Sequence, residues 1–507
     1  MSRPGFVLEV DERTPPLLIS EGAGCRLERL PLGSKVAYPA ESKPGVPHVA
    51  EAIGRALLAP HDQQPLAALL RPGMKVAIVF TDAARPAPGM ARPDVRTEAL
   101  EHVLSLAADA GVDDVRLVAA NGLRRMQSAE EIRQITGERV HRSFHADGLI
   151  GPHDAEAPDL VELAPGVTVH RAVGEADLVI DIAVVTDPGQ TGWNQLATGV
   201  TGAATAWAQQ GHGADDSVRS EVAGVLAAHL QVCHIEIVLD QHLHTGRLAF
   251  LDKREWEWSV RDRVNVLAMR RLQDLAPHRV RRSFLDAPSA PYGVLAVNAG
   301  SVDAVAAASR TVLLDQQTVD VGPAADVVIA GPAPVTEHNQ GAVMNPLIAA
   351  WDTLARTFGS HTGTPAVRPG GAMILFHPLP QEFNARFHAA SADFFEKVLT
   401  ATTDPAVIHA QHEAPFVSDE WYVNLYRTQN AFHGTHPLQL WYSIQPAIQH
   451  CGDIIWVGAD RASAERMGFR AASTLADALE IAAANVGRTP NITHLHTPPS
   501  LIAEVSA

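Results

Sequence analysis

The sequence has little of what marks secreted, membrane-spanning or nucleic-acid-binding proteins. Its 507 residues include three cysteines, Cys25, Cys233 and Cys451, which are too few and too far apart for a disulfide framework or a CxxC metal site. The N-terminal residues lack a signal-peptide pattern, and no apolar run reaches the length of a membrane span. A net charge of −17 disfavours nucleic acid and anionic membranes as partners. We therefore expect a cytoplasmic protein.

The sequence motifs of common cofactor sites are missing as well. GxGxxG, GxxxxGK[ST] and HExxH do not occur, so a standard nucleotide loop or zinc-protease helix is not supported. A glycine-punctuated run, QLATGVTGAAT (195–205), follows an apolar stretch. Such a run suits either a loop that wraps an anion at a helix start or a closely packed turn without a ligand. The residues alone leave both alternatives open.

What the sequence does contain is a regular alternation of strands and helices. Helical spacing covers 96–111, closed by Gly111, and 128–137, begun by Ser128 as an N-cap. This alternation predicts an α/β fold with two α/β domains, mainly parallel sheets and a ligand cleft between the domains. Short runs rich in Val and Ile predict the buried strands: 75–82, 114–121, 176–185, 235–240, 326–331, 371–378 and 453–458.

We expect the first domain to span residues 1–318 and the second to span 319–507. The stretch at about 251–293 is more charged and aromatic than its surroundings, so it is predicted as an insertion in the first domain. Ligands of parallel sheets bind beyond the carboxyl ends of the strands. The residues that directly follow the predicted strands are therefore the first candidates for a site.

Asp82 and Arg85 lie at the carboxyl end of the predicted strand at 75–82, in FTDAARPAPG. An arginine in that place can bind a carboxylate through two parallel hydrogen bonds, and an aspartate can orient it or bind a hydroxyl. A strand-end aspartate that caps a turn beside a solvated arginine is an equally good interpretation. A ligand bound by this pair would be a small acidic metabolite.

Three further candidates lie in other connecting segments. Arg124 follows the strand at 114–121, where a surface basic pair is the commoner outcome. His145 is predicted in the turn SFHADG, with a ring suited to proton transfer, although a single loop histidine is more often an ordinary surface residue. His338 lies in GPAPVTEHNQ, at the start of a predicted helix, where it either faces the cleft or caps the helix.

Taken together, these stretches resemble one family along nearly the whole chain, the nickel-pincer lactate racemases and related 2-hydroxyacid racemases and epimerases. The order of the matching stretches carries the resemblance. They are TDAARP for the family's SDxTRP, AANGLRRMQSAEEI for ATGxHRxxTxEEL, FHADG for NHD, EADLVIDIAVV with GVTGAAT for ADLVIxxG with GFSGGxK, DDSVRSEVAGVLAA with IEIVLD for NPVxxDxxEAA with NVVLN, GPAPVTEHN for GYPxDxN, RPGGAMIL for KxGGxII, and MGFRAASTLADALEIA for GFxxAxTVEEAL.

The resemblance implies two α/β domains around a nickel-pincer cofactor that is joined to a lysine through a thioamide. In such a site the cofactor's ring takes hydride from the substrate α-carbon, and histidines manage the hydroxyl proton. Asp82 and Arg85 match the family's substrate-binding pair. Arg124 stands where the family has a catalytic histidine, and Thr205 where it has the tethering lysine. His212 is the nearest candidate for the nickel-ligand histidine.

We therefore expect a diverged member of the family that lacks the tethering lysine and the catalytic histidines. It is predicted to be an isomerase, a racemase or epimerase, or a related enzyme, acting on a small 2-hydroxy acid or sugar acid. The alternative is a non-catalytic relative that binds a ligand or partner on the same scaffold. The cofactor stays unknown, because a thioamide tether needs a primary amine. The expected site comprises Asp82 and Arg85 for substrate, Arg124, His145 and His338 for catalysis, Gly199, Thr201, Gly202 and Thr205 for a cofactor or anion, and His212 for a metal.

Overall fold

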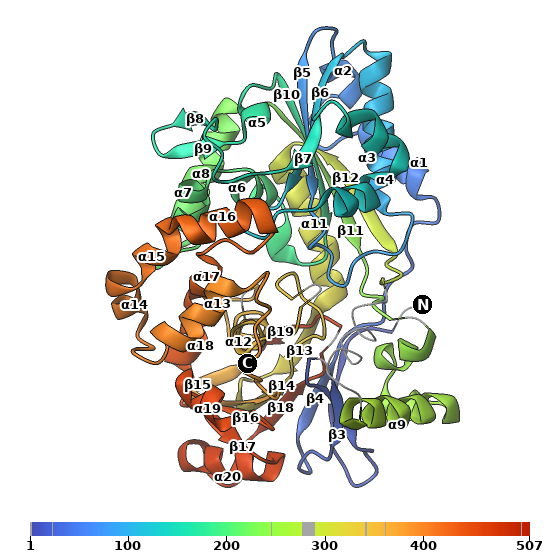
Figure 1. Cartoon of the computed structure of the whole chain (residues 1–507). Helices are drawn as coiled ribbons and strands as arrows, with labels where there is room; N and C mark the ends of the chain where they lie inside the picture. The colour runs from blue at the N-terminus through green and yellow to red at the C-terminus, as the bar shows by residue number, and fades with distance from the viewer. Residues whose placement is uncertain are drawn as a thin grey trace.

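The computed structural model shows two α/β units, one above the other in the view of Figure 1. It describes residues 3–22, 24–244, 246–275, 289–339, 342–359, 361–497 and 499–506. Each unit is built on one main sheet, and the sheets are mainly parallel, as predicted.

The main sheet of the first unit has the strand order β12-β11-β10-β5-β6-β7. Every residue of β10 and β11 is buried, because helices cover both faces of the sheet. All neighbours are parallel except β12, which pairs antiparallel with β11. The strands are β5 (Lys75–Thr81), β6 (Asp114–Ala120), β7 (Ile150–Pro152), β10 (Leu178–Val185), β11 (Val232–Leu239) and β12 (Val294–Gly300), and a small hairpin adds β8 (Val161–Ala164) and β9 (Val167–Val169).

Capping residues set the ends of two predicted helices in this unit. Asp94 caps α3 (Val95–Asp109), and Gly111 beyond its end has a φ of +72°. Ser128 begins α4 (Ala129–His145) with a capping box. The other helices are α1 (Val49–Leu58), α2 (Leu66–Leu69), α5 (Arg171–Gly174), α6 (Asn194–Gly199), α7 (Ala203–Ala208), α8 (Asp216–His229) and α11 (Val302–Gln317).

The main sheet of the second unit has the order β1-β4-β18-β14-β15-β16-β17. Only the edge strand β1 runs antiparallel to its neighbour. Its strands are β1 (Phe6–Glu9), β4 (Lys35–Tyr38), β14 (Ala325–Ala330), β15 (Val367–Phe376), β16 (Asp453–Val457), β17 (Arg470–Ala472) and β18 (Ile492–Leu495). Two strand pairs flank it: β2 (Leu17–Ser20) with β3 (Cys25–Glu28), and β13 (Thr318–Gly322) with β19 (Ile502–Val505).

The chain therefore begins in the second unit rather than in the first. β1 and β4 complete the sheet that is otherwise formed by residues beyond 318, so the N-terminal strands do not belong to the sheet of the unit that follows them. The expected range 1–318 placed them with the first unit. Local hydrophobic pattern identifies a strand but carries no information on its neighbour, since β4 and β18 are more than 450 residues apart in sequence.

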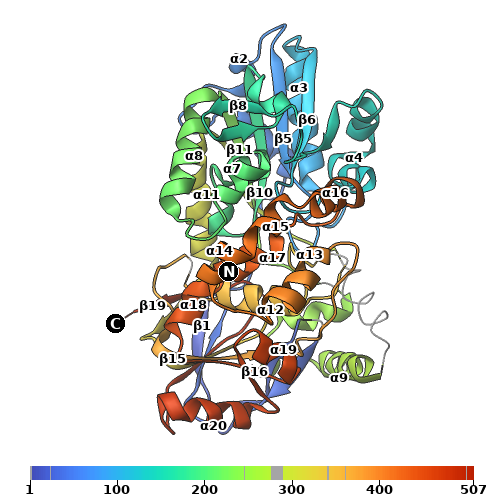
Figure 2. The ribbon, with the colours of Figure 1, turned by 60° about the vertical axis from the view of Figure 1, so that its left-hand side comes forward.

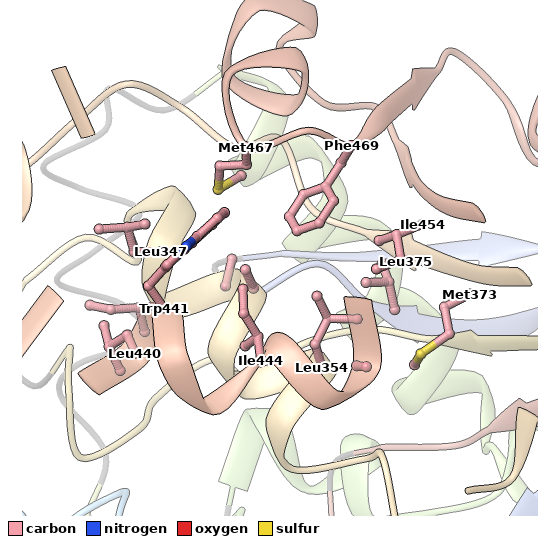
Figure 3. Close-up of a cluster of buried hydrophobic side chains, with 14 of the residues drawn as sticks. Leu347, Leu354, Met373, Leu375, Leu440, Trp441, Ile444, Ile454, Met467 and Phe469 are labelled. Carbon is pink, nitrogen blue, oxygen red and sulfur yellow. The ribbon is translucent and has the colours of Figure 1, made fainter. Parts of the chain in front are cut away.

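The core of the second unit lies between its sheet and the helices α12 and α17, as Figure 3 shows. Leu375 on β15 and Ile454 on β16 belong to the same buried cluster as Trp441 and Ile444, which come from the stretch around α17. The helices are α12 (Pro346–Ala350), followed by a π-helical turn at Trp351–Ala355, α13 (Ala389–Asp393), α14 (Pro405–Gln411), α15 (Glu413–Ser418), α16 (Glu420–Gln429), α17 (His436–Ser443), α18 (Gln445–His450), α19 (Arg461–Arg466) and α20 (Leu475–Val486).

The aromatic stretch that we predicted as an insertion connects β11 to β12 and leaves the first unit. Its helix α9 (Val260–Leu275) lies beside the N-terminal strands in both views (Figures 1 and 2). Trp258 and Val266 pack there against Leu18 and Cys25. Glu255 accepts hydrogen bonds from the Leu18 amide at 2.7 Å and from Tyr38. This segment of the first unit thus packs against the second unit and links the two.

No helix in the described ranges is long and apolar enough to cross a membrane.

Candidate functional site

A cavity of about 460 Å³ lies between the two units. In the first sheet the chain leaves β5 for β6 and later returns to the other side as β10, so the strand order reverses between β5 and β10. In the second sheet it reverses likewise between β14 and β18. Such reversals open a crevice at the carboxyl ends of the strands. The cavity is lined by segments that follow these strands and β11: 85–88, 186–190, 240–244 and 333–337.

Arg85 and Glu337 form an ion pair across the cavity wall. Nε of Arg85 donates to Oε2 of Glu337 at 2.6 Å, and Nη2 donates to Oε1 at 3.0 Å. Burial opposes the charge of Glu337, but the guanidinium outweighs it and holds the pKa of the carboxyl well below its usual range. Nη1 of Arg85 has no hydrogen-bond partner among the described residues, so one face of the cation is left for a ligand.

Asp82 lies behind Arg85, fully buried, and does not line the cavity. It forms an ion pair with Arg124, whose Nη2 is 3.0 Å from Oδ2 of Asp82. The turn that carries Asp82 and Arg85 is held by Arg96, whose Nη1 donates to three carbonyl oxygens, those of Thr81, Asp82 and Arg85. The structure therefore places Asp82, Arg85 and Arg124 near one another, and of the three only Arg85 lines the cavity.

A second polar contact crosses between the units at the cavity wall. Nε2 of His361 is 3.1 Å from Oδ2 of Asp187, which follows β10. Burial raises the pKa of Asp187, and the nearby His361 more than offsets this, so that the net shift is downward. Arg356 also lines the cavity and is paired with buried Asp352, at 3.2 Å. The cavity thus has a guanidinium from each unit, Arg85 and Arg356.

Asp240, directly after β11, is the cavity residue best suited to proton transfer. Its side chain is almost fully buried, and it accepts a hydrogen bond from the His242 amide at 3.0 Å. Burial raises its pKa above the ordinary value. A carboxyl group that holds its proton more firmly than usual is suited to general acid–base chemistry. Tyr292 and Trp351 line the same cavity and supply aromatic surface.

His338 belongs to a buried cluster behind the cavity rather than to its wall. It lies in a turn, not in the helix that the sequence predicted, and that helix begins only at Pro346. Nδ1 of His338 is 3.0 Å from Nε2 of His436, and its backbone oxygen is 2.9 Å from Nε2 of His388. Burial lowers the pKa of His338 to about 4. His338 reaches the cavity only through Glu337, which precedes it.

The two glycines of the run 195–205 are required by close packing. A side chain at Gly199, the last residue of α6, would place its Cβ 2.8 Å from Cβ of Ala120. A Cβ at Gly202 would lie 2.3 Å from Oγ1 of Thr168. Neither glycine lines the cavity. The structure thus favours the packed-turn interpretation of this run.

The two threonine hydroxyls of the run are also occupied by the protein itself. Thr201 is fully buried and donates to the carbonyl oxygen of Ala197 at 2.7 Å. Oγ1 of Thr205 accepts from the Thr168 amide and donates to the carbonyl oxygen of Gly166, both at 3.0 Å. These contacts give the expectation of an anion or cofactor at Gly199, Thr201, Gly202 and Thr205 no support.

Two predicted residues lie away from the site. His145 is the last residue of α4 rather than a turn residue, since the helix bends at Gly137 and continues; its exposed ring stacks on His141. His212 stacks on His409, 4.9 Å between ring centroids, beside a separate hollow. Within the described ranges, no three His, Cys, Asp or Glu side chains are arranged to hold a metal ion. The expected metal ligand His212 thus has no ligand set.

Sequence reasoning missed most of the cavity wall. Asp187 and Asp240 lie at the carboxyl ends of predicted strands, which is the same signal that pointed to Asp82. Arg356 and His361 carry no such signal, because they lie outside any strand end. Glu337 directly precedes His338, but nothing in the sequence marks it as a site residue; its place in the site is seen only from its pairing with Arg85.

Comparison with known proteins agrees with this architecture. Residues 29–195 match the family model of the lactate racemase N-terminal domain. Over 97% of this chain and 100% of the other, the fold is similar to that of the lactate racemase apoprotein from Thermoanaerobacterium thermosaccharolyticum, with a TM-score of 0.59 and 14% sequence identity. A protein from Thermotoga maritima gives a weaker likeness, with a TM-score of 0.45 and 10% identity over 90% of this chain and 97% of that one. No curated protein matches in sequence.

The chain is thus an α/β protein of the lactate racemase fold. Its residues 29–195 match the lactate racemase N-terminal domain model, in agreement with the family resemblance seen in the sequence.

The residues present do not fit a lysine-tethered nickel-pincer cofactor. Thr205, at the position of the tether, has no amine, and its hydroxyl is bonded to the backbone at 166–168. No lysine is among the described residues that line the cavity. Lys253, the next lysine after Lys75, is paired with Asp262 outside the cavity.

Proposed function

We propose that this protein is an isomerase-like enzyme that binds a small hydroxylated carboxylate, a 2-hydroxy acid or sugar acid, in the cavity between its units. The observation that carries this proposal is that one guanidinium from each unit, Arg85 and Arg356, lines a single cavity at the strand-order reversals of both sheets. Guanidinium groups suit a carboxylate because their donors match its two oxygens.

The remaining cavity wall suits hydroxyl groups and a proton transfer. Gln190 and Asn194 offer amide groups to hydroxyls, and Asp187 offers a carboxylate. Asp240 is the proposed acid–base group, since burial makes its carboxyl a stronger proton acceptor than usual. Asp82 and Arg124 do not line the cavity. Their ion pair holds the turn that carries Arg85, and the carboxylate of Asp82 stabilises the charge of Arg85.

The test is to incubate single enantiomers and epimers of 2-hydroxy acids and sugar acids with the protein in deuterium oxide. Chiral chromatography then reports inversion, and mass spectrometry reports deuterium gained at the α-carbon. We expect turnover of at least one compound and its loss in Arg85→Ala. Arg133→Ala is the matched control, because Arg133 is an exposed residue of α4. If no compound is changed and none raises the melting temperature, the proposal fails.

A non-catalytic ligand-binding protein is the second candidate. It is favoured by Thr205 at the tether position and by Arg124 at the position of a catalytic histidine, since guanidinium does not give up its proton near neutral pH. A ligand at about one hundred times its Kd raises stability by about 2.7 kcal/mol whether or not it reacts. Stabilisation without turnover over the whole panel therefore identifies a binder.

A further inference from the structure

A buried charged network lies beside the cavity and takes no part in the contacts described so far. At its centre is His234 on β11, between Asp181 on the neighbouring strand β10 and Glu236 on its own strand. Nδ1 of His234 is 3.0 Å from Oδ2 of Asp181, and Nε2 is 2.9 Å from Oε1 of Glu236. All three side chains are fully buried.

The two neighbouring carboxylates favour the protonated form of the His234 ring. An ionised carboxylate only accepts hydrogen bonds, and a neutral imidazole carries one N–H. Nε2 of His234 forms a hydrogen bond with Oε1 of Glu236, and Nδ1 lies at ion-pair distance from Oδ2 of Asp181, so that a protonated ring is attracted by both carboxylates. An uncompensated pair of buried carboxylates would also be very costly. The two carboxylates raise the pKa of His234 to about 10 against the opposing effect of burial.

From this centre, hydrogen bonds lead to the segment after β10 that lines the cavity. Oε1 of Glu236 accepts from the Gly192 amide at 2.6 Å. Oδ1 of Asp181 accepts from Nε2 of Gln195 at 2.6 Å. Gly192 and Gln195 bracket Asn194, and Asp187, Gly189 and Gln190 of the cavity wall lie just before them.

The same network also reaches the end of β5. Oε1 of Gln195 accepts from the Thr81 hydroxyl at 2.5 Å, and that hydroxyl accepts from the Val184 amide at 2.9 Å. Thr81 directly precedes Asp82. The segments on both sides of the strand-order reversal, after β5 and after β10, are therefore tied to one buried cation.

We propose that His234 is the positioning residue of the cavity: as a buried cation between Asp181 and Glu236, it holds the segment 186–195 and the end of β5 in place. His234 touches no cavity atom itself, so it acts through Gly192, Gln195 and Thr81. This role concerns the shape of the protein without ligand, so it can be tested apart from the proposed function.

The network has a defined dependence on pH. The charged groups that face His234 are Asp181 from β10 and Glu236 from β11; Gln195 of α6 and Asn298, opposite Glu236 on β12, carry no charge. The pKa of His234 is higher in the folded chain than its ordinary 6.5. Its protonation therefore contributes fully to the free energy of unfolding below about pH 6.5, and this contribution is lost as the pH rises through about 10. The segment 186–195 should therefore loosen on the alkaline side.

The experiment uses the full chain without ligand. Long-range proton–nitrogen spectra of histidine-labelled protein should show one ring with both nitrogens protonated at about pH 8, and His234→Gln should remove that signal. Hydrogen exchange of the Gly192 amide and its neighbours should become about tenfold faster in His234→Gln, with β16 amides unchanged. His153→Gln is the matched control, since His153 is an equally buried histidine of the first unit that contacts a backbone carbonyl oxygen, not a carboxylate.

If His234→Gln does not fold, Asp181→Asn replaces it. That variant keeps the ring and Glu236 but removes one carboxylate, so the ring signal should titrate at a lower pH than in the natural chain. A neutral His234 at about pH 8 would overturn the proposal. So would unchanged exchange at 186–195 in a folded His234→Gln variant, or an equal acceleration there in His153→Gln.

Discussion

Arg85 and Glu337 join the two α/β units through a pair of parallel hydrogen bonds, with Nε–Oε2 at 2.6 Å and Nη2–Oε1 at 3.0 Å. Arg85 follows β5, one of the two central strands of the first sheet, and Glu337 follows β14, which lies beside the order reversal of the second. The relative placement of the two sheets therefore depends in part on the same guanidinium that is proposed to bind substrate.

This double role predicts a large cost for removing either partner alone. Arg85→Met leaves Glu337 buried, with 15% of its side chain exposed, and should lower the free energy of unfolding by about 3 kcal/mol. The double variant Arg85→Met with Glu337→Met should recover most of that loss, because no charge is left unpaired. Denaturant unfolding measures both. A double variant no more stable than the single one would contradict the pairing.

The exposed pair Arg133 and Glu130 is the control for this cycle. Their side chains are 39% and 54% exposed, so Arg133→Met should leave the free energy of unfolding almost unchanged.

Asp240→Asn is expected to abolish turnover while leaving ligand binding in place. Because burial raises the pKa of Asp240 in the folded chain, ionisation at neutral pH opposes folding, and the amide should raise the melting temperature at pH 7. Calorimetry and the deuterium assay report the two effects separately. Asp315→Asn, at an exposed residue of α11, should change neither. Full activity in Asp240→Asn would exclude Asp240 as the acid–base group.

Glu255 makes the contact between the β11–β12 segment and the N-terminal strands sensitive to acid. Burial raises the pKa of Glu255, but His496 and the Leu18 amide outweigh this and lower it to about 2. A carboxyl group with a depressed pKa contributes stability above its ordinary pKa of 4.5, and this contribution is lost as the pH falls towards about 2. Across this pH range, the free energy of unfolding should change less steeply with pH in Glu255→Gln than in the natural chain.

Glu257→Gln is the control for that measurement, because Glu257 lies in the same segment and pairs with Arg3 at the surface. It should leave the slope as it is. Equal slopes in Glu255→Gln and the natural chain would show that Glu255 is not the group concerned.

Thr205 is expected to behave as a structural residue and not as a cofactor anchor. Thr205→Val removes the acceptor of the Thr168 amide and should cost about 1–3 kcal/mol, whereas Thr205→Ser keeps the hydroxyl and should cost less. The intact mass of protein purified from its native host should show no covalent addition at residues 195–205. An added mass on this segment would reverse our view of the run.

The sequence by itself determined the elements of this fold. The strands beginning near 75, 114 and 178 form as predicted, since continuous Val and Ile runs suit strands buried on both faces. Ser128 and Gly111 mark helix ends because capping is a local interaction. Asp82, Arg85 and Arg124 were singled out because they lie at or after the carboxyl ends of strands, and the structure pairs Asp82 with Arg124.

Only the tertiary structure decided which of these elements meet. The sequence does not show that β4 pairs with β18, that Arg85 pairs with Glu337, or that His361 reaches Asp187. Each contact joins residues more than 150 positions apart, and no periodic pattern encodes such a pairing. For the same reason, composition alone could not decide whether QLATGVTGAAT binds an anion or forms a packed turn. Its glycines and hydroxyls are explained by Ala120 and the backbone at 166–168, which pack against it in the folded chain.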